Sequence, residues 1–267
     1  MVETLGIYRR LAFARVRADW QYRGPFIGYT ITQGLISVLD FVQIAVIFGR
    51  VSSLQGWSVA EVAFLYGTSS VAFHIGDVFV SEVEFAPKRI RLGTFDSLLV
   101  RPMGAMVQLC ADEFAFRRAG KLVQAVAILV WAMAAVSVAW TPARVGVFVM
   151  MLVAGTAIFG SIWVITSSLT FWMIEAGEVM NSFTYGSAFA TEYPMVVFGR
   201  WLRRLFTFVV PAAFVNYYPA LFVLGKSDRL GGPSWRRFAS PFVAVVMVLL
   251  ASFVWRLALR HYRSTGS

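Results

Sequence analysis

The chain has 267 residues, of which 58% are hydrophobic and 14% are charged, and its formal net charge is +10. A soluble domain carries about 25% charged residues, so this composition excludes an ordinary soluble fold and indicates helices that face lipid, where side chains need no charge. The basic residues stand between apolar runs, which favours membrane topology over nucleic-acid binding, and the single cysteine, Cys110, excludes an intramolecular disulfide and a cysteine-based metal site.

Residues 1–25 are predicted to form an amphipathic helix that lies on the cytoplasmic face of the membrane. Apolar residues from Leu5 to Trp20 recur at helical spacing, and four arginines fall mostly off that stripe, toward lipid phosphates. Gly24 and Pro25 interrupt the pattern. The apolar run that follows is too long for a signal peptide and has no small-residue cleavage site, so we expect an uncleaved first span.

Five apolar runs are long enough to predict spanning helices, which need about 20 residues each. With the connecting loops, these runs leave no room for a sizeable soluble domain, so residues 26–267 are predicted to form one transmembrane domain. The predicted spans are 26–49, 61–82, 119–140, 145–171 and 239–259.

Residues 173–225 allow two interpretations. One is a polar span at 176–198 followed by a broken apolar hairpin at 199–225, and the other is an interfacial helix followed by one span at 203–224. Prolines at membrane depth need protein or water to satisfy the carbonyls that they free. The prolines that interrupt this stretch are Pro194, Pro211 and Pro219.

Positive charge predicts the orientation of the spans. Residues 1–25 carry five arginines, residues 83–121 carry seven lysines and arginines, and three arginines follow Trp255. Because basic loops remain in the cytoplasm, we expect both termini and the 83–121 loop on that side. Residues 198–239 carry seven more basic residues, which conflicts with the rule if this segment lies outside.

No catalytic constellation is found in the sequence. The two histidines are far apart, and no paired carboxylates, nucleophile elbow or zinc-protease motif occurs. The stretch Ala220–Ser227 reads ALFVLGKS, which ends like a phosphate-binding loop but lacks its first glycine and its glycine-rich interior. We therefore expect a chain that is not itself an enzyme, holds no metal or cofactor, and depends on another chain for any ATP hydrolysis.

The most informative loop is residues 82–106, EVEFAPKRIRLGTFDSLLVRPMGAM. Its central run IRLGTFDSLLVRP resembles the short cytoplasmic coupling segment of ABC-2 permeases, the group known as ABC-2 family transporter proteins. Further stretches that resemble the family follow in order along the chain. They are the Phe171–Trp172 pair with Glu175, VVPAAFVNYYPALFVLG at 209–225, and the terminal YRSTGS at 262–267.

The resemblance implies an all-α fold with six transmembrane helices of the ABC-2 exporter type, in the bacterial inner (plasma) membrane. It implies a second permease subunit, either the same or a homologous chain, and two copies of an ATPase subunit that binds ATP and Mg²⁺. In the family a segment after the fifth span re-enters from the outer face. This favours the span at 176–198 and a re-entrant hairpin at 199–225, with Arg200, Arg203 and Arg204 outside.

The residue pattern of the 83–106 loop agrees with a coupling role. Its apolar residues, from Ile90 to Leu99, are interpreted as one face of a short helix that sits in a groove of the ATPase. The charged residues then project to water or to the partner; they are Arg89, Arg91, Asp96 and Arg101. The alternative is a solvated loop that arginines hold to the bilayer. Gly93 permits a turn, and Pro102 ends the helix. The predicted ATPase-coupling residues are Arg91, Leu92, Gly93, Phe95, Asp96, Leu98, Leu99, Arg101 and Pro102.

Ionisable and polar residues inside the predicted spans are candidates for a substrate path. A charge at the bilayer centre costs at least about 2.5–3.5 kcal/mol, so such residues are functional candidates by default. His74 and Asp77 are three residues apart and share a helix face. The alternative role is a structural hydrogen bond between helices. The candidate substrate-path residues are Asp40, His74, Asp77, Asn181 and Glu192.

These observations predict the permease subunit of an ATP-driven exporter that moves an amphipathic or lipid-like substrate outward. One alternative is a secondary transporter driven by an ion gradient, with Asp40, His74 or Asp77 as its coupling site. A second alternative is a membrane-embedded structural or assembly protein. The composition does not identify the substrate, because the many aromatic residues are as well explained by interfaces and packing.

Overall fold

The computed structural model describes residues 17, 23–100, 103–112, 119–173 and 177–262. Within these residues the secondary structure is helical, apart from one isolated β-bridge between Leu54 and Trp57. Most of the interfacial helix predicted at 1–25 lies outside the described residues. Gly24 and Pro25 fall in the first turn of α2, not in a break before it.

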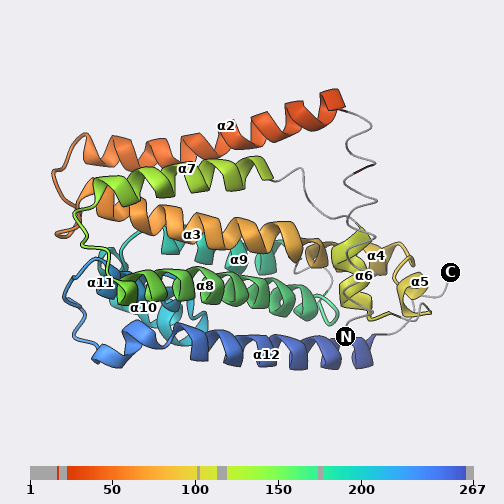
Figure 1. The fold of residues 1–267 in the computed structure, drawn as a ribbon. Coiled ribbons are helices and arrows are strands. Elements are labelled where there is room, and N and C mark those ends of the chain that lie inside the picture. Colours follow the sequence, from red (N-terminus) through yellow and green to blue (C-terminus); the bar gives the residue numbers. More distant parts are fainter. Residues whose placement is uncertain (1–16, 18–22, 101–102, 113–118, 174–176, 263–267) are drawn as a thin grey trace.

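The long helices of the described residues run side by side along the long axis of the structure, and shorter helices gather at its two ends (Figure 1). The long helices are α2 (Arg23–Phe48), α3 (Val59–Phe79), α7 (Ala119–Ala135), α8 (Pro142–Leu169), α9 (Gly177–Thr191) and α12 (Ser240–His261). Between α3 and α7 lie η1 (Ser81–Phe85), α4 (Ala86–Arg91), α5 (Asp96–Leu99) and α6 (Ala105–Asp112). Between α9 and α12 lie η4 (Met195–Val197), α10 (Arg200–Arg204), η5 (Leu205–Val209), η6 (Ala212–Phe214), α11 (Tyr217–Val223) and η7 (Ser234–Phe238).

Four of the described helices, α2, α3, α8 and α12, are long and apolar enough to cross a membrane. The segments Arg200–Val209 and Ala212–Val223 pass the same test together, but they are bent by 75° and form either a broken span or a re-entrant loop. Helix α7 has 17 residues and α9 has 15, and both fall short of the usual length of a span. The chain is therefore a polytopic membrane protein with four or five candidate spans, and six spans stay a prediction.

The central helix is α3, which packs against α2, α7, α8 and α9. Small residues let the backbones approach one another, as is common between membrane helices. A side chain at Gly67 would meet Leu129 of α7 at 2.8 Å, and one at Gly155 of α8 would meet Ala72 at 3.2 Å. The helix begins with a capping box, in which Ser58 and Glu61 each bond the other's backbone N–H.

The outer helices α2 and α12 expose apolar side chains that an aqueous surface would not tolerate. Leu35 and Leu39 on α2 and Leu249 and Phe253 on α12 are all more than 60% exposed. Their exposure is explained by a lipid environment, because apolar surface loses its hydrophobic penalty there.

The two ends of the helix bundle are built differently. Helices α4, α5 and α6 lie at one end, where α2 begins and α12 ends, and α10 and α11 lie near the opposite end (Figure 1). The start of α2, the loop between α3 and α7, and the end of α12 thus share one side of the bundle. This is the arrangement that the distribution of basic residues predicts, and which membrane face it occupies stays a prediction.

Candidate functional site

The loop between α3 and α7 has a hydrophobic core of its own. Its core side chains come from η1 and from α4 to α6, and they pack on Val164 of α8 and on Ala251 and Trp255 of α12. The loop is therefore fixed to two long helices and does not float beside the bundle. Its buried members are Val83, Ala86, Ile90, Phe95, Leu98, Ala105, Leu109 and Cys110.

A turn at Gly93 divides the loop into two short helices. Gly93 has a φ of +68°, which suits glycine, and its N–H donates to the Ile90 carbonyl at 3.1 Å. Helix α4 ends at Arg91, and α5 begins only at Asp96. The prediction of one short helix with a single apolar face is therefore wrong, because the turn changes the direction of the chain in the middle of the apolar pattern.

Phe95 and Leu98 face the chain's own interior. Phe95 is 0% exposed, and its ring centre lies 5.4 Å from that of Phe171 and 5.0 Å from that of Tyr262. Leu98 is 1% exposed. In this arrangement neither side chain is accessible to a partner, which corrects their interpretation as direct docking anchors: they anchor the loop to α8 and α12.

Other apolar side chains of the loop point outward. Leu92 is 65% exposed, Leu99 is 46% exposed and Val100 is 84% exposed. Arg91, which precedes Leu92 in the chain, is exposed as well. Val100 was not selected from the sequence, although the run Leu98–Leu99–Val100 is apolar on more sides than a single helix face can bury. These outward residues, Arg91, Leu92, Leu99 and Val100, are called the exposed loop face below.

Asp96 is held by the last helix of the chain. The Tyr262 hydroxyl donates to Asp96 Oδ1 at 2.8 Å. Burial, together with this hydrogen bond and the nearby carboxylate charge, raises the pKa of Tyr262 to about 12. The sequence analysis predicts that Asp96 projects to water or to the partner. In the structure Asp96 is half-buried. Arg101 and Pro102 lie outside the described residues.

A polar cavity of about 200 Å³ lies among α2, α3, α7 and α9. It brings together two of the predicted substrate-path residues, His74 and Glu192. Lys121 also lines it; the sequence interpretation counted this lysine only as a topology signal. The other lining residues are Gln43, Tyr66, Ser69, Ser70, Phe73, Tyr185, Ala188 and Phe189.

His74 lies close to Asp77 without a hydrogen bond between them. Its Nδ1 is 3.9 Å from Asp77 Oδ2, which is too long for one. The same nitrogen is buried and has no hydrogen-bond partner among the described residues. A ligand or water in the cavity is therefore the natural partner for this imidazole, because buried polar atoms are usually satisfied.

The remaining predicted substrate-path residues lie elsewhere. Asn181 lines a separate cavity, next to Glu84, Lys88 and Arg91 of the loop end. Asp40 lies on α2, and its side chain is outside the described part of the structure. The sequence therefore predicted two members of the polar cavity, and the structure does not bring Asn181 to it.

The segment 195–223 is fixed to α3 and α9 by a residue that sequence reasoning missed. Asn216 is fully buried, and its Nδ2 donates to the Leu65 carbonyl at 2.8 Å and to the Thr191 carbonyl at 2.7 Å. Thr191 is also hydrogen-bonded to Ser69 of α3. The sequence feature that could have indicated this role is the position of Asn216, an amide side chain within the apolar run VVPAAFVNYYPALFVLG.

The chain was compared with family models, curated proteins and solved structures. A model of the family described as "ABC-2 family transporter protein" matches residues 35–266. Neither the search of curated proteins nor the search of solved structures gives a match. Within the described residues, no group of three or more His, Cys, Asp or Glu side chains is placed to hold a metal ion.

Proposed function

The chain belongs to the ABC-2 family of transporter proteins, and from this premise we propose that it is the membrane-spanning permease subunit of an ATP-driven exporter. The family match spans most of the chain, including the loop between α3 and α7. The permease is the transmembrane component of such a transporter and works with an ATP-binding subunit. The partners are two copies of that ATPase and a second permease chain, in the bacterial inner membrane.

The observation that carries this proposal is the construction of the 83–106 loop. It has an inward side that packs on α8 and α12 and an exposed loop face, whose apolar members Leu92, Leu99 and Val100 are 46% to 84% exposed. A helix that docks in a groove of a partner protein needs such apolar anchors, surrounded by a charged rim. Leu92, Leu99 and Val100 supply the anchors and Arg91 the rim. When the ATPases close on ATP, the force enters at this face and passes through Phe95 to α12.

The proposed topology has six crossings and a re-entrant segment. The six long helices α2, α3, α7, α8, α9 and α12 lie side by side, and α10 and α11 lie near the end opposite the loop (Figure 1). The 75° bend between Arg200–Val209 and Ala212–Val223 supports a re-entrant segment more than a straight span. Both termini and the 83–106 loop are then cytoplasmic, and the arginines of α10 are outside.

The substrate path is proposed to include the polar cavity at His74 and Glu192. The cavity has a histidine, a lysine and a glutamate among aromatic side chains, and such a mixture suits an amphipathic molecule with a polar head. It is bounded partly by α2, whose apolar face is exposed. That face is suited to contact lipid or the second permease, so the path opens at the subunit interface.

A specific observation favours one second candidate, an ion-gradient-driven secondary transporter. The Nδ1 of His74 is buried beside Asp77 and has no hydrogen-bond partner in the described part of the chain, an arrangement that proton coupling uses. The two functions differ in their energy source. An ionophore abolishes transport by a secondary transporter, whereas inactivating the partner ATPase abolishes transport by an ABC exporter.

The proposal is tested by purifying the full-length chain from its native membrane and identifying its bound proteins. We expect an ATP-binding subunit to co-purify in about equal amount. Purified chain free of that subunit should neither bind nor hydrolyse ATP. Vanadate-sensitive ATP turnover by a preparation shown to contain only this chain would contradict the proposal.

A further inference from the structure

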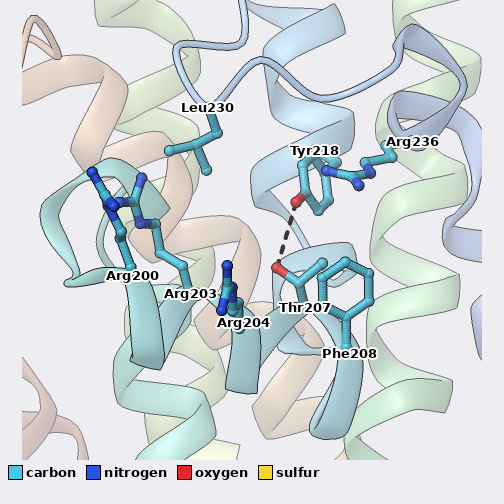
Figure 2. Close-up of a pocket in the computed structure, with 8 residues that line it drawn as sticks. All are labelled: Arg200, Arg203, Arg204, Thr207, Phe208, Tyr218, Leu230 and Arg236. Carbon is cyan, nitrogen blue, oxygen red and sulfur yellow. Dashed lines mark hydrogen bonds between the residues drawn. The ribbon is translucent and has the colours of Figure 1, made fainter.

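A cavity of about 190 Å³ lies at the end of the bundle opposite the 83–106 loop. Four arginines line it, and they come from two segments of the chain (Figure 2). Arg200, Arg203 and Arg204 belong to α10, and Arg236 belongs to η7. Guanidinium groups that line one cavity repel one another, so the fold brings like charges together at an energetic cost.

The carboxylate of Asp228 lies near Arg236 but does not line the cavity: Asp228 Oδ2 and Arg236 Nη1 would each be 2.7 Å from a side-chain carbon added at Gly232. No aspartate or glutamate lines it in the described part of the chain. Asp228 accepts hydrogen bonds from the backbone N–H groups of Leu230 and Gly232, at 2.9 and 3.1 Å. Glu61 pairs with Lys226 at 2.7 Å. Asp228 is therefore a carboxylate beside Arg236, whereas the lining itself, in the described part of the chain, supplies four guanidinium groups and no carboxylate.

Polar groups of the lining have hydrogen-bonding capacity to spare within the described residues. Arg203 Nε is buried and has no hydrogen-bond partner among the described residues. The hydroxyls of Thr207 and Tyr218 lie 3.4 Å apart, a long separation for a hydroxyl pair. Arg236 is held in place from the side, since its guanidinium lies 5.7 Å from the centre of the Tyr218 ring.

We propose that this cavity binds a phosphate group. Guanidinium forks match the oxygens of phosphate in a bidentate manner, and one phosphate offers enough oxygens for several arginines. Exposed tryptophans, which are typical of the membrane–water interface, stand next to lining arginines in the chain: Trp201, after Arg200, is 72% exposed, and Trp235, before Arg236, is 61% exposed. A phospholipid headgroup, at this depth, is the source that the surroundings favour. The site does not depend on the ATPase.

The proposal also explains the charge distribution. Basic residues at the end opposite a cytoplasmic loop are contrary to the rule that positive loops stay inside. Here the arginines of α10 and η7 bind a ligand and do not set the orientation of the chain. The basic residues of 198–239 conflict with the rule that basic loops remain in the cytoplasm, and binding of a phosphate group gives that conflict a chemical cause.

The test uses the full-length chain in detergent and native mass spectrometry, with phosphatidylglycerol as the probe and a phosphate-free glycolipid of equal chain length beside it. Arg203→Gln and Arg236→Gln each remove one guanidinium from the cavity. Arg237→Gln is the matched control, because Arg237 stands on the same short helix η7 but does not line the cavity.

We expect phosphatidylglycerol to bind the wild type and the glycolipid not to bind. Each cavity variant should weaken binding roughly tenfold or more, the effect of one charge-assisted hydrogen-bonding group. The Arg237→Gln control should stay within about twofold of wild type. Equal binding by the cavity variants and the wild type would overturn the proposal, and so would an equal loss in the control, which would indicate general surface charge.

Soluble probes distinguish the two sources of phosphate. If glycerol phosphate at millimolar concentration displaces the lipid, the site takes free phosphate groups; if only the lipid binds, the site is a headgroup site.

Thermal unfolding checks the folding of the variants. Because Arg203→Gln removes repulsion, it should unfold no earlier than wild type without ligand, and ligand should raise the midpoints of the wild type and of Arg237→Gln more than those of the two cavity variants. No rise in the wild type with either probe would overturn the proposal.

Discussion

The hydroxyl of Tyr262 donates a hydrogen bond of 2.8 Å to Asp96 Oδ1, and this bond joins the end of the last long helix to the first residue of α5. The ring of Phe95 lies against the same tyrosine, with 5.0 Å between ring centres. A displacement of α5 is therefore passed directly to α12. In the proposed transporter, this contact links the ATPase docking site to a membrane span.

The Tyr262–Asp96 bond should matter more for coupling than for assembly. Tyr262→Phe removes the hydroxyl but keeps the ring against Phe95, so we expect the ATPase to remain bound while transport per ATP hydrolysed falls severalfold. A hydrogen bond to a charged acceptor contributes about 1.5–3 kcal/mol, less where water competes. ATP turnover and transport are measured together in proteoliposomes.

Asp96→Asn is the milder control for this bond, because the amide oxygen still accepts from Tyr262. A pH series gives a second readout. The raised pKa of Tyr262 means that the bond's contribution is fully present below pH 10.0, the ordinary value, and is lost as the pH rises toward 12. The stability difference between wild type and Tyr262→Phe should therefore shrink only above pH 10.0; a constant difference would contradict this account.

Phe95→Ala should damage the fold of the loop. The side chain is fully buried among α5, Phe171 and Tyr262, and truncating a buried phenylalanine costs about 3–5 kcal/mol. We expect a lower midpoint of thermal unfolding and less protein in the membrane. Leu92→Ala, which truncates an exposed side chain in the same loop, should change the stability by no more than about 0.5 kcal/mol. Equal stability of the two variants would show that Phe95 is not an anchor.

Cys110 should be nearly inert to thiol reagents. It is buried in α6, and burial, assisted by the charge of Glu82, raises its pKa from 9.0 to about 12. Because the thiolate is the reactive form, its fraction at neutral pH falls about a thousandfold. The native chain in permeabilised membranes should therefore not react with a maleimide within minutes. Rapid labelling that denaturant does not increase would contradict the burial of this residue.

Single cysteines can then report the topology against an unreactive background. Arg204→Cys is placed on the exposed side of α10, and Leu92→Cys on the exposed loop face. With a membrane-impermeant maleimide, Arg204→Cys should be labelled in intact cells and Leu92→Cys only after permeabilisation. If both cysteine variants were labelled only after permeabilisation, the result would support a single span at 203–224 and contradict the re-entrant segment.

Long apolar runs were readily located from the sequence, because the number of residues needed to cross a bilayer is fixed by the helical rise. Helices α2, α3, α8 and α12 lie within a few residues of the predicted spans. The 173–225 stretch stayed ambiguous because its short helices are fixed by distant partners. Asn216, which holds it to α3 through the Leu65 carbonyl, is an example.

The candidate site shows the same limit. That the 83–106 loop is special was visible in its sequence, but which side chains face inward was not. Phe95 is buried because Tyr262, 167 positions later in the printed sequence, lies over it. Periodicity within a loop cannot report such a contact. The turn at Gly93 further separates residues that one helix would have placed on a single face.

The most direct test of the account is ATPase binding by a variant of the exposed loop face. Val100→Asp puts a carboxylate where an apolar anchor is proposed, and Val59→Asp is the control, an exposed valine at the start of α3 where a helix N-terminus accepts an acid. The account predicts that Val100→Asp lowers co-purification of the ATPase about tenfold, as loss of an interface anchor does, with equal amounts of chain in the membrane. Wild-type ATPase binding and ATP-dependent transport by Val100→Asp would contradict it.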